Sequence, residues 1–341
     1  MKILKGLPGY FQLTGGFSPA RPLYLMLNLE TPCRYSCLKC ALPGCGCGRV
    51  MGPPLSLTER KRVIQIAQKT GVKALVIIGA GEPTDKHGFP IVRPVVECAA
   101  ELGMTTILFT TLYGLTGQQA DFFKKHDVSL YVSLDSLDSG VYRKLTGSGR
   151  LERILPRIEL LRRLYKPETA GADTIVRLGI NTTVNVQNYG ELERIRAFAG
   201  DDMHYVANYP IRRGRFAQSR IWQELVGYRY EEIKRRAHDL SETGGPTSVA
   251  EGVCSYFFRG VSVEIDGQLL VCGYAGETGD CFGNVRQWGG VEDLLRHWRR
   301  IQGSYSDFVE SCGRSSPCPL RDEVYPRLLT KFNDSPFRIL S

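Results

Sequence analysis

Residues 33–40 of this chain read CRYSCLKC, so that Cys33, Cys37 and Cys40 follow the spacing CxxxCxxC. They come shortly after the apolar run LYLMLNL at residues 23–29, which predicts a buried β-strand. A loop that follows a strand lies at the carboxyl end of a parallel sheet, where α/β barrels assemble their active sites. Three thiolates in such a loop can hold three irons of a cubane and leave the fourth iron open to an outside ligand. A zinc knuckle, or a closed electron-transfer cluster with Cys45 or Cys47 as the fourth ligand, is the alternative.

The sequence around this segment alternates β-branched runs with amphipathic stretches, a pattern typical of repeated βα units around a parallel sheet. The predicted strands are residues 23–29, 73–79, 104–110, 128–134, 174–184 and 203–209. Ser56-Leu57-Thr58-Glu59 is a capping box that opens a helix reaching about residue 69, and further helices are predicted at residues 92–102, 118–126, 151–164 and 191–198. Six βα units do not close an eight-stranded barrel, so we predict an open, partial (βα)6 TIM-like barrel.

The pattern changes after this barrel. Residues 221–240 are predicted to be helical, and the stretch that follows is rich in Gly, Ser and Thr. Residues 261–265 and 268–271 flank Asp266-Gly267, which predicts a β-hairpin. We therefore divide the chain into an N-terminal extension (residues 1–22), the barrel (23–240) and a smaller C-terminal domain (241–341).

Composition limits the function. The 341 residues include eleven cysteines and carry a net charge of +9. No signal peptide or membrane-length apolar run is evident, so we expect a cytoplasmic protein without membrane contact, whose thiols serve metal binding or catalysis. The Lys and Arg residues are spread along the chain, which makes nucleic acid an unlikely partner and fits an anionic substrate better.

At CRYSCLKC the chain resembles the radical S-adenosylmethionine (radical SAM) superfamily. The resemblance implies that Cys33, Cys37 and Cys40 hold a 4Fe–4S cluster whose open iron binds the methionine end of SAM. It further implies reductive cleavage of SAM to a 5'-deoxyadenosyl radical, which takes hydrogen from a substrate, and an electron donor such as flavodoxin or ferredoxin. One position departs from the family, which has an aromatic residue near the adenine where this chain has Lys39. Tyr35, or the methylene stem of Lys39, is expected to cover the adenine instead.

Further cofactor contacts are expected at the ends of the strands. Gly79-Ala80-Gly81-Glu82-Pro83 is similar to the family's GGEP element, whose strand-end carbonyls bond the ammonium group of SAM with help from the glutamate. An ordinary Gly-Pro turn is the alternative. Ser133 and Asp135 are expected near the ribose hydroxyls because they share one face of an alternating strand. By resemblance, Asn181 and Val184 line the carboxylate and adenine of the cofactor, with ordinary strand residues as the alternative. Thr110, at the end of its strand, is a weaker candidate. Arg212, Arg213 and Arg215 follow the sixth strand at the same rim, where they meet an anionic group or form a solvated loop.

The C-terminal cysteines are too dense to be explained by packing. Cys254 and Cys272 flank the predicted hairpin, an arrangement that resembles the opening half of the SPASM domain, an auxiliary-cluster module of radical SAM enzymes. The closing half lacks two thiolate positions, which favours the shorter twitch type with a single auxiliary 4Fe–4S cluster. The expected ligands are Cys254, Cys272, Cys312 and Cys318, with Cys281 or Asp322 as substitutes and a structural zinc site as the alternative. Cys98 lies on an apolar helix face and is expected in the core.

Two substrate classes remain open. The leading hypothesis is hydrogen abstraction from a small polar metabolite such as a sugar, cyclitol or nucleoside, for oxidation or a related C–H functionalisation. The alternative is a maturase that oxidises, crosslinks or epimerises a residue of a peptide or protein. Epimerisation needs a hydrogen donor, for which the candidate thiols are Cys45, Cys47 and Cys281.

Overall fold

The computed structural model describes residues 1–16, 18, 20–40, 52–79, 81–147, 149–242, 259–270 and 283–312, the last nine of these as helix backbone only. No helix within these residues is long and apolar enough to cross a lipid bilayer.

The core of the molecule is a parallel sheet whose strands are neighbours in chain order. It contains β2 (Tyr24–Leu27), β3 (Ala74–Ile77), β4 (Thr105–Thr110), β5 (Val128–Ser133), β8 (Leu178–Thr183) and β9 (His204–Asn208). Each pairs in parallel with the next. These are the six strands predicted from the sequence, and the partial barrel is confirmed.

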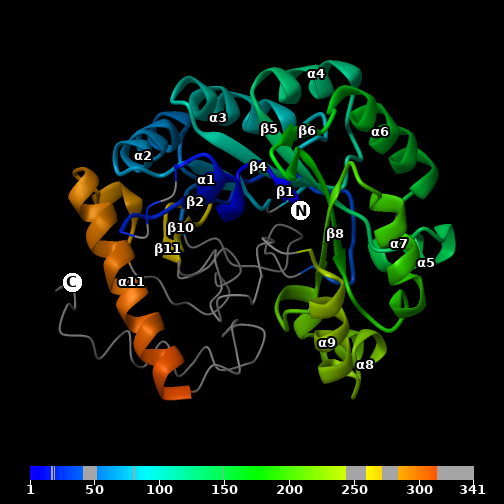
Figure 1. Ribbon diagram of the computed structural model, residues 1–341. Helices are drawn as coiled ribbons and strands as arrows, with labels where there is room; N and C mark the ends of the chain where they lie inside the picture. Colours follow the sequence, from blue (N-terminus) through cyan, green and yellow to red (C-terminus); the bar gives the residue numbers. More distant parts are fainter. Residues whose placement is uncertain are drawn as a thin grey trace.

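Helices follow the strands and form an arc outside the sheet (Figure 1). They are α2 (Leu57–Lys69), α3 (Phe89–Glu101), α4 (Gly117–Lys125), α5 (Ser139–Thr146), α6 (Leu151–Leu164) and α7 (Leu192–Ala199). The Ser56 hydroxyl accepts from the Glu59 N–H while the Glu59 carboxylate accepts from the Ser56 N–H, so the predicted capping box is present. Cys98 is buried on α3, as expected. The short helix α5 was not predicted.

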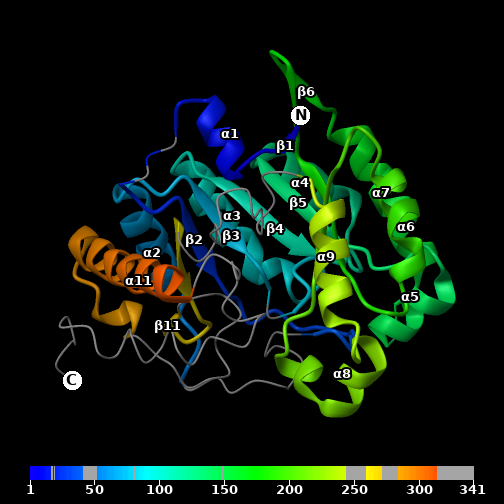
Figure 2. The same ribbon diagram turned by 60° about the horizontal axis from the view of Figure 1, so that its bottom comes forward.

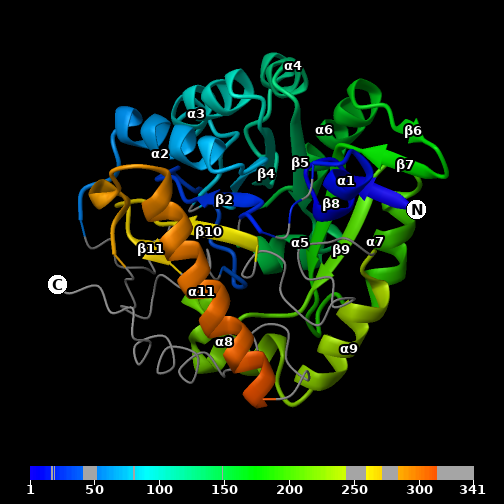
Figure 3. The ribbon, with the colours of Figure 1, turned by 60° about the vertical axis from the view of Figure 1, so that its left-hand side comes forward.

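The predicted hairpin is present, and it continues the sheet of the barrel. β10 (Gly260–Val263) pairs antiparallel with β11 (Leu269–Leu270) and parallel with β2. Gly267 permits the turn because its φ is +87°, a conformation that favours glycine. Helix α11 (Val291–Cys312) packs against α2 and β10 beyond this edge (Figure 3). The division after residue 240 remains a prediction, but β10 is joined to the barrel by backbone hydrogen bonds.

One predicted strand is wrong in extent. Residues 174–184 do not form a single strand, because the chain bends at Arg177 and divides into β7 (Asp173–Val176) and β8. The Arg177 guanidinium donates to the carbonyls of Phe123, Lys124 and Val128, which turns this residue toward the start of β5. β7 then joins a second sheet, in the order β1-β7-β6, with β1 (Lys2–Leu4) and β6 (Glu168–Ala170).

The N-terminal segment closes the amino end of the barrel. α1 (Pro8–Leu13) follows β1, and Figure 2 shows α1 and β6 at the end of the molecule opposite to α8 (Ser219–Leu225). Gly6 lies against the side chain of Ile107, and the Lys5 carbonyl accepts from the Ser129 hydroxyl at 2.8 Å. The sequence had indicated only an extension here.

The single helix predicted at residues 221–240 is also wrong, since α8 ends at Leu225 and α9 (Tyr230–Leu240) begins after a break. Gly227 has φ +55° and its N–H donates to the Trp222 carbonyl, an arrangement that ends a helix. Short 3-10 turns complete the described chain at Tyr189–Glu191, Gly214–Ala217 and Val285–Gln287.

Candidate active site

The three cysteines lie in the loop after β2, at the carboxyl edge of the sheet, and their side chains are half-buried. The loop begins against the end of β3, where the Glu82 N–H donates to the Pro32 carbonyl at 3.1 Å. Gly81 makes this approach possible. A Cβ at Gly81 would lie 1.5 Å from the Thr31 carbonyl oxygen. The GGEP-like element and the cysteine loop, far apart in sequence, therefore pack backbone to backbone.

Two further contacts hold the loop on its other sides. The N–H groups of Ser36 and Leu38 donate to the last carbonyls of α5, those of Thr146 at 3.1 Å and Leu145 at 2.9 Å. Arg215 donates its guanidinium to the Ser36 carbonyl at 2.8 Å and its backbone N–H to the Cys40 carbonyl at 2.9 Å. Arg215, which the sequence predicts to meet an anionic group or solvent, lies on the cysteine loop instead.

The donor set of this loop fits an iron–sulfur cluster. Among the described residues, no three His, Cys, Asp or Glu side chains converge closely enough to hold one metal ion. A cubane does not require such convergence, because each thiolate binds a different iron. Three cysteine thiols on a loop fixed by backbone hydrogen bonds are therefore the ligands that a site-open cluster needs.

Glu82 is buried and connects the ends of β3 and β4. Its carboxylate accepts from the backbone N–H of Thr84 at 2.9 Å and of Thr111 at 2.7 Å. The hydroxyls of Thr84, Thr110 and Thr111 donate to the same carboxylate. Five protein donors therefore satisfy Glu82, and its direct effect is to fix the two strand ends. Thr110, expected to contact the cofactor, is one of these donors.

Register places a series of side chains on the inner face of the barrel. Phe109, Tyr131, Gly179 and His204 are aligned across β4, β5, β8 and β9. Because Gly179 has no side chain, the Tyr131 hydroxyl reaches across β8 to His204 Nδ1 at 3.0 Å. Two residues further along β5 and β8, Ser133 and Asn181 pair in register and are half-exposed. The inner face therefore changes from a filled interior to polar side chains toward the carboxyl edge.

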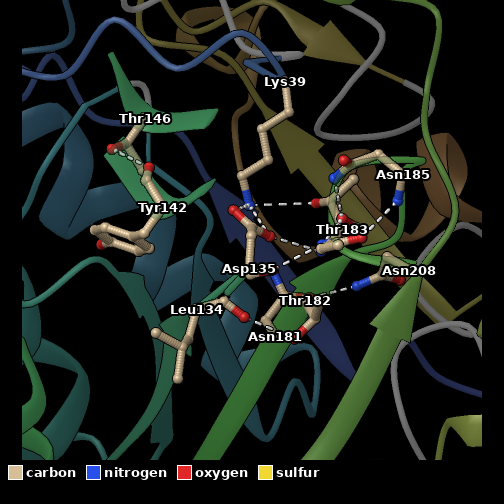
Figure 4. A network of polar contacts seen from close by, with 11 residues as sticks. Lys39, Leu134, Asp135, Tyr142, Thr146, Asn181, Thr182, Thr183, Asn185 and Asn208 are labelled. Atoms are coloured by element: carbon tan, nitrogen blue, oxygen red, sulfur yellow. Dashed lines mark hydrogen bonds and ion pairs between the residues drawn. The ribbon is translucent and has the colours of Figure 1, made fainter. Parts of the chain in front are cut away.

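The next row carries an ion pair (Figure 4). The Lys39 ammonium lies 2.6 Å from Asp135 Oδ1 and 2.5 Å from Asp135 Oδ2, and the Thr183 N–H donates to Oδ1 at 2.8 Å. Asn208 donates its side-chain amide to Asn181 beside this pair. Lys39, Asp135 and Asn181 are thus brought together at one side of the barrel mouth.

Other predicted contacts lie elsewhere or remain untested. Tyr35 is 4% exposed and its ring packs edge-on against Tyr113, with 5.2 Å between centroids. Burial raises the pKa of its phenol well above the usual range. Val184 is buried at the end of β8, and Arg212 stacks over the Trp222 ring. The cofactor roles of Tyr35 and Val184 therefore remain predictions.

Several predicted cofactor contacts, cluster ligands and thiol hydrogen donors lie outside the described residues, so the structure tests neither an auxiliary cluster nor a thiol hydrogen donor. They are Ala80, Cys45, Cys47, Cys254, Cys272, Cys281, Cys318, Asp322 and the side chain of Cys312.

Sequence reasoning missed a buried carboxylate on the inner face. Glu264 follows β10, and the register of β10 with β2 places it beside Asn28, which donates to Glu264 Oε2 at 3.2 Å. Its other oxygen accepts from the N–H of Ile265 at 2.8 Å. Within the described part of the chain no cation pairs with Glu264. Burial raises its pKa, and the negative charge of Asp266 adds to the rise.

Glu264→Gln is expected to reduce the loss of stability with rising pH. Because the pKa of Glu264 is higher in the folded than in the unfolded protein, the folded state keeps its proton above about pH 4.3, the ordinary glutamate value, while the unfolded state releases it. Stability therefore falls as the pH rises through this window, and glutamine removes that contribution. Melting temperatures measured from pH 4 to pH 8, with the exposed Glu101→Gln as control, test this. An unchanged slope in Glu264→Gln would contradict it.

Comparison with known proteins agrees with this geometry. Residues 31–198 match the model of the radical SAM superfamily, from the start of the cysteine loop to α7. A probable GTP 3',8-cyclase of Pyrococcus abyssi is 31% identical over 160 residues, which cover 46% of this chain and 48% of that protein. This chain thus spans about half the length of that relative. A GTP 3',8-cyclase of Pseudomonas savastanoi is 25% identical over 284 residues, covering 73% of this chain and 78% of the relative.

Solved structures share the fold. SuiB of Streptococcus suis bound to the precursor peptide SuiA has a TM-score of 0.59 at 16% identity, covering 86% of this chain and 69% of SuiB. The structure of anSMEcpe with bound AdoMet has a TM-score of 0.56 at 12% identity, covering 92% of this chain and all of that one. At these identities the likeness shows the architecture. The matched family model shows that residues 31–198 of this chain carry a radical SAM domain.

Proposed function

We propose that this protein cleaves SAM reductively at a 4Fe–4S cluster held by Cys33, Cys37 and Cys40, and that the resulting 5'-deoxyadenosyl radical takes hydrogen from a small polar metabolite. The observation that carries this proposal is the contact between Gly81 and Thr31, which joins the GGEP-like element to the cysteine loop. A structural zinc knuckle does not require a second element to approach it so closely.

When bound, the cluster supplies the electron that breaks a carbon–sulfur bond of SAM. The protein's own residues would orient SAM and the substrate and enclose them. Glu82 accepts hydrogen bonds from the segments that follow β3 and β4, and it thereby holds the chain next to Gly81 in a fixed orientation. The polar side chains of Ser133 and Asn181 offer hydroxyl and amide groups toward the mouth of the barrel. Such groups suit the hydroxyls of a ribose or of a polar substrate.

The polar inner face also supports a small polar substrate, such as a nucleoside, sugar or cyclitol. Two of the relatives that match over the barrel are named for a reaction of GTP, which is a nucleotide. The net charge of +9 favours an anionic substrate of this kind. We take oxidation, or a related C–H functionalisation, as the reaction.

A peptide or protein maturase is the second candidate. SuiB and anSMEcpe share the fold and were solved with peptides, at TM-scores of 0.59 and 0.52. In this case Cys45, Cys47 or Cys281 would supply hydrogen for an epimerisation. Substrate-dependent formation of 5'-deoxyadenosine, with deuterium transferred from a labelled nucleotide, sugar or peptide, separates the two classes.

We further propose one auxiliary 4Fe–4S cluster, held by Cys254, Cys272, Cys312 and Cys318, with Cys281 or Asp322 as substitutes. A cluster near the substrate would accept an electron if the reaction is an oxidation. An electron donor such as flavodoxin or ferredoxin would reduce the first cluster.

The test is anaerobic reconstitution with iron and sulfide, followed by measurement of iron per chain and of 5'-deoxyadenosine formed from SAM under reduction. About eight irons with cleavage are expected from two cubanes. About four irons with cleavage would remove the auxiliary cluster and leave the radical chemistry. Zinc without cleavage would overturn the proposed function.

A further inference from the structure

Lys39 stands immediately before Cys40, and its side chain reaches from the cysteine loop to two strand ends (Figure 4). Its ammonium contacts both oxygens of Asp135, at 2.6 and 2.5 Å, and the Thr183 hydroxyl at 3.3 Å. Asp135 follows β5, and Thr183 is the last residue of β8. One side chain therefore ties the segment of the third cysteine to two neighbouring strands.

This ion pair occupies the Asp135 carboxylate. Besides Lys39, the Thr183 N–H donates to Oδ1 at 2.8 Å, and the Asp135 side chain is 1% exposed. The contact of Asp135 with a ribose hydroxyl therefore stays a prediction, and in this structure the carboxylate contacts Lys39 through both oxygens. Removing Lys39 would leave a buried carboxylate without its cation, which is strongly unfavourable. The pair is therefore a persistent part of the site.

The strand ends below the pair are themselves fixed. The side-chain amide of Asn188 donates to the carbonyls of Asp135 and Thr183, at 2.8 and 3.0 Å. The Asn185 amide donates to the same Thr183 carbonyl at 2.9 Å. Lys39 is thus attached to a rigid base, and the position of Cys40 depends on this attachment on one side and on Arg215 on the other.

We propose that Lys39 is a positioning residue for the SAM pocket. Its ion pair with Asp135 sets the distance between the third cysteine and the ends of β5 and β8, which would form two walls of the cofactor site. A charged link thereby replaces the aromatic residue that the sequence lacks at this position. This inference rests on the proposed function, because it assigns Lys39 a part in holding SAM.

The experiment uses the reconstituted full chain and measures SAM affinity by equilibrium dialysis, together with the change that SAM causes in the electron paramagnetic resonance spectrum of the reduced cluster. Lys39→Met is expected to bind SAM about tenfold or more weakly and to lose the spectral change. Asp135→Asn should behave alike, and the double variant should lose no more than either single one, because both changes break one interaction.

Two variants separate positioning from general stability. Lys5→Met removes a lysine from a more exposed ion pair with Asp127, 2.8 Å long, at the amino end of the barrel, and should leave SAM affinity unchanged. Lys39→Arg keeps a cation that can pair with the carboxylate, and is expected to bind SAM within about threefold of the parent. If Lys39→Met loses iron, this arginine variant still decides the question.

Binding of SAM by Lys39→Met that is equal to or tighter than that of the parent overturns the inference. So does an iron-loaded Lys39→Arg variant that fails to bind SAM, since the charge would then not be what matters. Either result leaves the proposed function intact if the parent protein still cleaves SAM. A parent protein that neither binds nor cleaves SAM overturns both.

Discussion

Replacing Cys37 with alanine is expected to reduce formation of 5'-deoxyadenosine to background and to remove about four irons per chain. Cys37 is the second of the three cysteines in the CxxxCxxC loop, and the two thiolates that remain are too few to retain a 4Fe–4S cluster. The loop itself should stay folded, because its anchors are backbone hydrogen bonds from Ser36 and Leu38 and the Arg215 contacts. Iron analysis and SAM cleavage on the same reconstituted sample test this.

Cys98→Ala is the matched control. Cys98 is 4% exposed on α3, away from the cysteine loop, so the substitution removes a thiol without touching the site. It should retain cleavage and iron while losing stability to the extent that a small core cavity requires. Cleavage that survives in Cys37→Ala would mean that the N-terminal loop does not hold the reacting cluster.

The six barrel strands could be predicted from the sequence because each is a short apolar run between turn residues. Strand β6 is missing from the prediction although it pairs locally with β7. Strand β1 could not be predicted, because its pairing with β7 joins Lys2 to Thr174 across about half of the chain. No local pattern reports a contact of that range. The division at Arg177 has the same origin, since its guanidinium bonds carbonyls around the start of β5 and bends a run that looks continuous in sequence.

The site residues also fall into those that local sequence patterns indicate and those that depend on long-range contacts. Cysteine spacing and the GGEP-like element are local signals, and both identified residues that the structure brings together. Lys39 and Asp135 are 96 positions apart, and neither residue type indicates its partner. Glu264 was missed because its burial follows from the pairing of β10 with β2. In a hairpin whose apolar and polar residues alternate, a carboxylate side chain is expected to face solvent.

Gly81→Ala is expected to lower the free energy of unfolding by about 1–3 kcal/mol and SAM cleavage by about a hundredfold. The new Cβ would lie 1.5 Å from the Thr31 carbonyl oxygen and 2.5 Å from its carbon. Both are backbone atoms, so no side-chain rotation relieves the clash. The strand end and the cysteine loop must move apart, and the hydrogen bond from the Glu82 N–H to the Pro32 carbonyl is lost with them.

Gly190→Ala provides the control, because a Cβ there meets nothing within 4 Å and stability and cleavage should stay unchanged. Chemical denaturation, iron content and 5'-deoxyadenosine are measured for both variants. Loss of stability with full cleavage would mean that the GGEP-like element supports the fold but does not place SAM. If SAM cleavage depends on the approach of Gly81 to Thr31, both the stability and the SAM cleavage of Gly81→Ala should fall.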